Sequence, residues 1–180
     1  PGFVEEDERK HRNLNPITLI TLEAKCSALL PPDLIRGKTV LDLGACLGAM
    51  CHWSLYHGAS KAVGVEPQKD FCQRMEKYLA SAEAAWPEPQ SSLKRYEVIC
   101  ADARAYLSKC EDQYFDVVVA AGVLHCFQDP ISILLEIARV PKEAIVIESV
   151  HPIFYRKGLS SEPNSFSGST LELNPSAAVN

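Results

Sequence analysis

Acidic side chains stand at the ends of three short apolar runs in this sequence, and they are the residues best placed to do chemistry. Asp42 follows the run TVL, Glu66 follows AVGV, and Asp102 comes after YEVIC. Carboxylates accept hydrogen bonds from hydroxyl and amino groups, and they attract cations. The three side chains therefore predict a site for a positively charged ligand that carries hydrogen-bond donors and no phosphate.

A glycine turn follows Asp42. Gly44 and Gly48 bracket the turn, and an apolar helical pattern begins at Ala49. Glycine allows the backbone to come close to a ligand, and the first N–H groups of a helix point toward it, so this arrangement is typical of nucleotide-like ligands. The dinucleotide fingerprint fails here because its second and third glycines are Cys46 and Ala49, and no Gly-Lys-Ser/Thr sequence of a P-loop occurs.

An adenosine ligand that bears a positive charge fits this pattern better than a phosphorylated nucleotide. Glu66 is placed to accept hydrogen bonds from both ribose hydroxyls, and Asp102 to accept one from an adenine amino group. Simpler structural roles exist for the same side chains. Asp42 could cap the turn that follows it, and Asp102 is also a good helix N-cap.

Strand-like and helix-like patterns alternate five times along the chain, without an internal repeat. The expected strands are 39–43, 62–65, 96–100, 115–120 and 144–148, and the expected helices are 16–30, 48–57, 69–84, a short one after 102, and one from 130. This alternation predicts an α/β fold with a doubly wound, mostly parallel sheet. Ligands of such sheets bind outside the carboxyl ends of the strands, where Gly122 and His125 would join the three acids.

The motifs at these strand ends resemble those of a known family. VLDLGACLG is similar to the first motif of the class I S-adenosylmethionine-dependent methyltransferases, and VGVEP to their ribose-binding segment. CADA resembles their adenine-binding segment, and FDVVVAAGVLHCFQDP their fourth-strand segment. The resemblance covers residues 37–149 in order and spacing, and it implies a Rossmann-like methyltransferase fold with S-adenosylmethionine as cofactor. The stretch from Gly37 to Pro67 also resembles the wobble-uridine tRNA-modifying transferases.

The resemblance assigns roles to individual residues. The cofactor-binding set that it implies is Asp42, Gly44, Ala45, Cys46, Gly48, Glu66, Pro67, Asp102, Ala103 and Ala120. In this set the first motif lines the methionine end, Glu66 holds the ribose, Asp102 and Ala103 border the adenine, and Ala120 borders the methionine amino group. Cys46 stands where the family has its middle glycine, so we expect a bulkier turn whose side chain points away from the cofactor or touches its methionine portion.

Methyl transfer from a sulfonium is an in-line displacement, so alignment and exclusion of water supply much of the catalysis. A general base helps only when the acceptor must lose a proton. His125 follows the fourth strand and is the candidate base, although a loop histidine that only packs or caps is the simpler interpretation. His151 and Tyr155, just past the fifth strand, are weaker candidates.

The composition of the chain limits the classes of methyl acceptor and the cellular compartment that we expect. A net charge of −5 argues against broad, non-specific binding of phosphate groups. The sequence motifs of the nucleic-acid methyltransferases that modify amino groups or cytosine C5 are also absent. A small-molecule acceptor is therefore the first choice, and tRNA remains the open alternative. No apolar run spans a bilayer, which argues against a membrane partner. The seven cysteines are scattered without a Cys-x-x-Cys pair, which indicates reduced thiols in a cytoplasmic protein and no metal site.

We expect three segments: an N-terminal arm and capping helix (1–36), an S-adenosylmethionine-binding core (37–150), and a C-terminal tail (151–180) that can form part of a substrate cap. The charged arm 1–13 is either a solvated terminus or a lid. The tail fits a terminal strand hairpin poorly, with one weak strand around 170–173, and the chain begins Pro-Gly-Phe. A fragment of a larger protein, including a non-catalytic cofactor-binding or partner module, therefore remains the alternative to a complete enzyme, and the oligomeric state is open.

Overall fold

The computed structural model describes residues 16–85, 94–149 and 169–172 of the 180-residue chain. Several predictions from the sequence lie outside these residues. They concern the charged arm 1–13 and the candidate side chains His151 and Tyr155.

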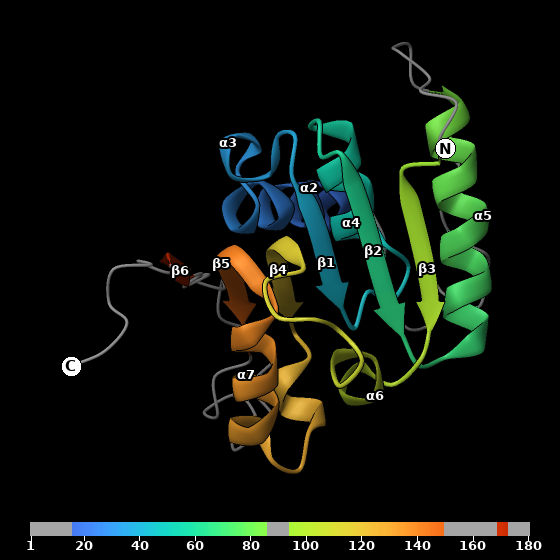
Figure 1. The fold of residues 1–180 in the computed structure, drawn as a ribbon. Helices are drawn as coiled ribbons and strands as arrows, with labels where there is room; N and C mark the ends of the chain where they lie inside the picture. Colours follow the sequence, from blue (N-terminus) through green and yellow to red (C-terminus); the bar gives the residue numbers. More distant parts are fainter. Residues whose placement is uncertain (1–15, 86–93, 150–168, 173–180) are drawn as a thin grey trace.

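Six strands form one sheet in the order β3-β2-β1-β4-β5-β6. The strands are β1 (Thr39–Leu43), β2 (Lys61–Glu66), β3 (Tyr96–Cys100), β4 (Phe115–Ala121), β5 (Pro141–Glu148) and β6 (Ser169–Glu172). The first five are parallel, and β6 pairs antiparallel with β5. Figure 1 shows β1, β2 and β3 pointing the same way, so that their carboxyl ends meet at one edge. The predicted α/β class and mostly parallel sheet are confirmed.

The strand predictions were accurate where apolar runs are continuous. The central strands β1 and β4 are buried on both faces, because helices cover both sides of the sheet. The strand β5 begins at Pro141, earlier than the predicted residue 144, and Lys142 and Glu143 near its start are exposed. Proline is tolerated as the first residue of a strand, so the apolar pattern alone missed this beginning.

Seven helical segments connect and cover the strands in the described residues: α2 (Pro16–Leu29), α3 (Pro32–Ile35), α4 (Ala49–Tyr56), α5 (Lys69–Ala85), α6 (Ala103–Leu107), the 3₁₀ helix η1 (Leu124–Cys126) and α7 (Pro130–Arg139). The sequence pattern does not predict α3 and η1, which are too short to show a helical period. The predicted cap at Asp102 formed, because its side chain accepts a hydrogen bond from Ala105 N at 3.1 Å, and Asp129 caps α7 in the same way by accepting one from Ser132 N at 3.0 Å. None of these helices has the length and apolar content needed to cross a membrane.

The helices pack on the sheet through three apolar clusters. On one face, α2 and α4 cover β1, β4 and β5 through side chains such as Leu30, Val119 and Val146. On the opposite face, α6, η1 and α7 cover the sheet through a cluster that includes Leu41 and Ile133. The third cluster joins α4 and α5 to β2 and β3, and it includes Met75. The helices therefore cover both faces of the sheet, and the loops that follow the strands lie at its carboxyl edge.

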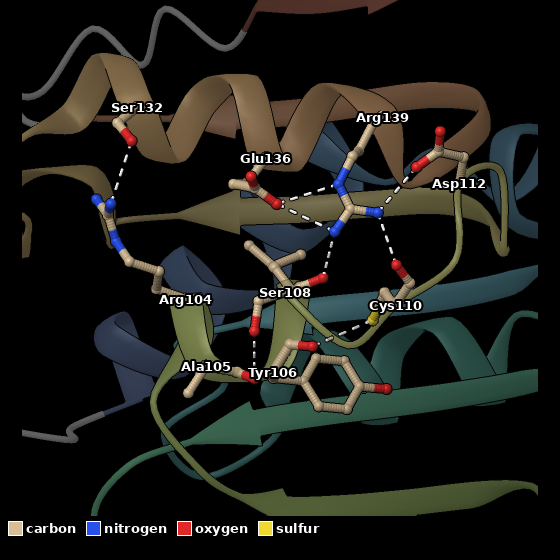
Figure 2. A network of polar contacts seen from close by, with 10 residues as sticks. Arg104, Ala105, Tyr106, Ser108, Cys110, Asp112, Ser132, Glu136 and Arg139 are labelled. Atoms are coloured by element: carbon tan, nitrogen blue, oxygen red, sulfur yellow. Dashed lines mark hydrogen bonds and ion pairs between the residues drawn. The ribbon is translucent and has the colours of Figure 1, made fainter.

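Arg139, at the end of α7, ties that helix to α6 and to the loop before β4 (Figure 2). Its guanidinium donates to the carbonyl oxygens of Leu107 and Cys110, each at 2.6 Å. It also pairs with Asp112 at 2.9 Å and with Glu136 at 3.0 Å. Carbonyl acceptors and carboxylates together satisfy the fixed fork of the guanidinium, so this network fixes the helical layer over β4.

A second polar network closes the amino edge of the sheet. Asp116 of β4 accepts hydrogen bonds from the backbone N and the hydroxyl of Thr39, at 2.7 and 2.9 Å, and pairs with Lys142 of β5 at 3.2 Å. Burial raises the pKa of Asp116, but these hydrogen bonds and the Lys142 charge outweigh it and leave the pKa below its ordinary value. One carboxylate thus joins the starts of three neighbouring strands.

Candidate functional site at the carboxyl edge of the sheet

The turn between β1 and α4 requires glycine for two reasons. Gly44 and Gly48 have positive φ angles of 71° and 81°, which L residues with a side chain rarely adopt. A Cβ on Gly44 would lie 2.8 Å from Cγ2 of Val123, and one on Gly48 would lie 2.7 Å from Cγ of Met75. The turn is therefore packed tightly between α5 and the loop that follows β4.

Cys46 occupies the middle of this turn with φ of 53°, a left-handed conformation that a residue with a side chain adopts at a cost of about 1 kcal/mol. Its backbone N–H donates to Oε2 of Glu66 at 3.0 Å. The thiol is half-buried. The sequence predicts that Cys46 makes this turn bulkier than a glycine would. The backbone of Cys46 also adopts a conformation that glycine adopts more easily.

Glu66 ends β2 and is buried, with 5% of its surface exposed. Its two carboxylate oxygens are each held by a backbone N–H group: Oε2 by Cys46 and Oε1 by Gln68, both at 3.0 Å. A carboxylate offers about four acceptor positions, so each oxygen can accept a further hydrogen bond. The side chain is oriented in advance and keeps acceptor capacity for hydroxyl groups of a ligand.

Asp42 lies in β1 with 3% of its surface exposed, on the face covered by α4. The thiol of Cys51 in α4 lies 3.8 Å from its Oδ2 and donates to it. Burial raises the pKa of Asp42, and the nearby charge of Glu66 adds to this effect; the Cys51 thiol and Lys25 act in the opposite direction, and the resulting pKa is about 7. The ionised Asp42 carboxylate therefore destabilises the folded protein.

The remaining predicted cofactor residues differ in exposure. Pro67 and Asp102 are exposed, and Ala45 and Ala103 are buried. Ala120 is fully buried, and its side chain packs in the cluster under α7, so only its backbone can meet a ligand at the edge.

His125, the candidate base, is exposed on η1. Its loop is held beside the turn, because Val123 in the same loop fills the space next to Gly44. The structure thus brings the segment that carries His125 next to the first glycine of the turn, as the topology predicted.

Two charged residues at this edge were not predicted as site residues. Glu148 is the last residue of β5, and its Oε2 lies 3.0 Å from Nζ of Lys25 in α2. The signal for Glu148 was available, because it ends an apolar strand exactly as Glu66 does. No sequence signal identifies Lys25, which reaches the edge only because α2 packs across β4 and β5.

An open hollow of about 660 Å³ lies between α5 and the edge strand β3. Its lining residues are Lys69, Cys72, Gln73, Glu76, Lys77 and Cys100. The strand-end acids do not line this hollow; they are Asp42, Glu66, Asp102 and Glu148. The candidate functional site is therefore assigned from the chemistry of these acids and not from the hollow. Within the described residues no group of three or more histidine, cysteine or acidic side chains is arranged to hold a metal ion.

The sequence from residue 41 to residue 144, more than half of the chain, matches the model of the family described as "Methyltransferase domain". The chain belongs to this family. The cofactor of this methyltransferase domain is S-adenosylmethionine. No curated protein matches the sequence.

Solved structures share the fold of this methyltransferase domain. An S-adenosylmethionine-dependent methyltransferase from Mesorhizobium loti is 24% identical, with a TM-score of 0.55 over 73% of this chain and 54% of that one. Magnesium protoporphyrin IX methyltransferase from Synechocystis, solved with the cofactor bound, is 15% identical, with a TM-score of 0.54 over 71% and 56%. A candidate RNA methyltransferase from Pyrococcus horikoshii is 20% identical, with a TM-score of 0.52 over 74% and 64%. The chain thus spans between half and two thirds of these proteins.

Proposed function

We propose that this chain transfers the methyl group of S-adenosylmethionine to a small-molecule acceptor by in-line displacement. The observation that carries the proposal is the arrangement of Glu66. A buried carboxylate with both oxygens fixed by backbone N–H groups is suited to bind a pair of vicinal hydroxyls, such as those of a ribose.

The other residues of the carboxyl edge suit the remaining parts of the cofactor. Gly44 and Gly48 would let the backbone approach the methionine end, where the Asp42 carboxylate complements a cationic group. Asp102, together with Pro67 and Ala103, would border the adenine. The Asp102 carboxylate already caps α6 through one oxygen, which leaves the other oxygen for an amino group.

When bound, the cofactor supplies a sulfonium-activated methyl group, and its sulfur leaves as a neutral thioether. The chain then needs mainly to align the acceptor and to exclude water. The exposed His125 can accept a proton from an acceptor hydroxyl or amine, and it is our candidate general base. An acceptor that is already nucleophilic would need no base, and His125 would then only shape the loop.

A small molecule is the acceptor class that the charge of the chain favours. The net charge of −5 makes non-specific attraction to polyanions weak. Among the neighbours, magnesium protoporphyrin IX methyltransferase is named for a small-molecule acceptor. The candidate RNA methyltransferase keeps tRNA as the second possibility, and a non-catalytic cofactor-binding module is the third. The seven free thiols support a reducing, cytoplasm-like compartment as part of this proposal.

Calorimetric titration with S-adenosylmethionine and S-adenosylhomocysteine tests the cofactor site. We expect Glu66→Ala to weaken both ligands more than about 100-fold, because it removes a charged acceptor and leaves two backbone N–H groups unpaired. Glu97→Ala is the matched control, since Glu97 is exposed on the neighbouring strand β3 and pairs with Lys61 at the surface. Equal binding by the wild-type and Glu66→Ala proteins would refute the assignment.

Methyl transfer from radiolabelled cofactor separates the candidate acceptors. The protein is incubated with a metabolite extract and, separately, with a tRNA fraction. Label in the metabolite extract alone is the expected result. Label in tRNA would move the proposal to the second acceptor class, and no label in either fraction, despite tight cofactor binding, would favour the non-catalytic module.

A further inference from the structure

Lys25 places a positive charge among the acids of the carboxyl edge. Its ammonium pairs with Glu148 at the end of β5, and its charge lowers the pKa of Asp42 at the end of β1. The Lys25 and Glu148 side chains are 25% and 18% exposed, so solvent screens this pair less than it screens a surface pair. Lys25 therefore lies at the end of β5, on the face that α2 covers.

A cation at this position can bind an anionic group of a ligand, which the acids of the site cannot do. The methionine portion of the cofactor carries an ammonium group, a sulfonium and one carboxylate. Asp42, Glu66 and Glu148 suit the positive groups but repel the carboxylate. Arg104, beside Asp102, is bound elsewhere, because it donates to Ser132 Oγ at 3.1 Å and to the carbonyl of Asp129 at 3.3 Å.

Lys25 also has donors to spare. An ammonium carries three hydrogen-bond donors, and Glu148 takes one of them. Within the described part of the chain no other acceptor is bonded to the Lys25 ammonium. Glu148 itself is held at its edge position, since the backbone carbonyl of Glu148 accepts from Gly122 N at 2.8 Å.

We propose that Lys25 binds the carboxylate of the cofactor's methionine portion, while Glu148 holds the ammonium in position. The inference rests on the proposed use of S-adenosylmethionine by this chain. It assigns to α2, which lies outside the residues matched by the family's model, a direct part in recognising the cofactor.

Two ligands that differ only in the amino-acid portion test this role in the full chain. S-adenosylhomocysteine carries the carboxylate, whereas 5′-methylthioadenosine has the same adenosine and thioether sulfur without it. We expect Lys25→Met to weaken S-adenosylhomocysteine about 10- to 100-fold, as for a lost charge-assisted hydrogen bond, and to leave 5′-methylthioadenosine within about twofold. Lys25→Arg should recover part of the lost affinity.

Further variants separate carboxylate binding from a structural role of the ion pair. Glu148→Gln breaks the pair but keeps the lysine, so its affinity for S-adenosylhomocysteine should equal or exceed that of the wild type. The double variant Lys25→Met/Glu148→Gln should stay as weak as Lys25→Met. Lys38→Met removes the lysine of a comparable pair, with Glu143 at the amino edge, and should bind both ligands normally.

Three results would overturn the inference. Lys25→Met could bind S-adenosylhomocysteine as the wild type does, it could lose both ligands equally, or the double variant could regain wild-type affinity, in which case the lysine only neutralises Glu148. Failure of the proposed function looks different, because the wild-type protein would then bind neither ligand.

Discussion

The two edges of the sheet hold their aspartates in opposite ways. Asp116 at the amino edge has three strong partners, from Thr39 and Lys142, and its pKa lies below the ordinary value. Asp42 at the carboxyl edge is more deeply buried, has the weak Cys51 thiol as donor, and has a pKa raised to about 7. The Asp116 carboxylate stabilises the fold, whereas the Asp42 carboxylate is retained at a cost to it.

Each edge also has one strained backbone position, and the two positions differ in what they hold. Cys46 at the carboxyl edge and Gln113 at the amino edge are the non-glycine residues with positive φ within the described ranges, and both have φ of 53°. Gln113 lies in an exposed loop, with its N–H donated to the carbonyl of Arg139. Cys46 lies in the turn that orients Glu66. A strained backbone position beside a buried charge is expected where a protein binds a ligand.

The largest effect should come from Asp42→Asn, which removes a charge that burial opposes. A carboxyl whose folded pKa is raised stabilises the protein fully only below its unfolded pKa, near 4, and that contribution is lost as the pH rises to about 7. The variant should therefore be more stable than the wild type by about 2–4 kcal/mol at pH 8 and by less at pH 5. Denaturant unfolding at both pH values measures this.

The same variant should bind S-adenosylmethionine at least about 10-fold more weakly at pH 8, because the anion that complements the cationic cofactor is gone. Stability and affinity would then change in opposite directions. A stability gain that is the same at pH 5 and pH 8 would contradict the assignment of the effect to the Asp42 charge.

Asp116→Asn should have a smaller effect of the opposite sign on stability. Because the folded pKa of Asp116 is depressed, its contribution is present above the unfolded pKa and is lost as the pH falls through the folded value. We expect a loss of about 1–3 kcal/mol at pH 7, with unchanged calorimetric affinity for S-adenosylhomocysteine. Asp112→Asn, at a side chain that is 74% exposed, should cost little. Weaker cofactor binding by Asp116→Asn would contradict the assignment of a purely structural role to the Asp116 carboxylate.

The smallest effect concerns the two strained residues. Cys46→Gly and Gln113→Gly should each stabilise the protein by up to about 1 kcal/mol, because glycine adopts the left-handed conformation without strain. Only Cys46→Gly should change the affinity for S-adenosylhomocysteine, and we expect it to increase. Thermal unfolding and calorimetry of the pair check this, and an equal change of affinity in both variants would argue against a special role for the turn.

Much of the fold was predictable because its signals are local. The continuous apolar run of β4 and the capping residue Asp102 each act within a few residues, and the structure confirms the elements that they predicted. The short segments α3 and η1 and the early start of β5 escaped prediction. Their formation depends on packing against the finished sheet more than on a period in the sequence.

By itself, the sequence determined the parallel α/β fold, the glycine turn and the acids at the strand ends, because strand direction and side-chain alternation follow from local pattern. Only the tertiary structure decided that Glu66 is locked by Cys46 and Gln68, that burial raises the pKa of Asp42, and that Lys25 reaches Glu148. Apart from the Gln68 hydrogen bond, these features depend on residues that are 20 or more positions from Glu66 or from Glu148 along the chain, or on burial by other elements. Their energies depend on distance and on exclusion of water, which exist only once helices and sheet have packed.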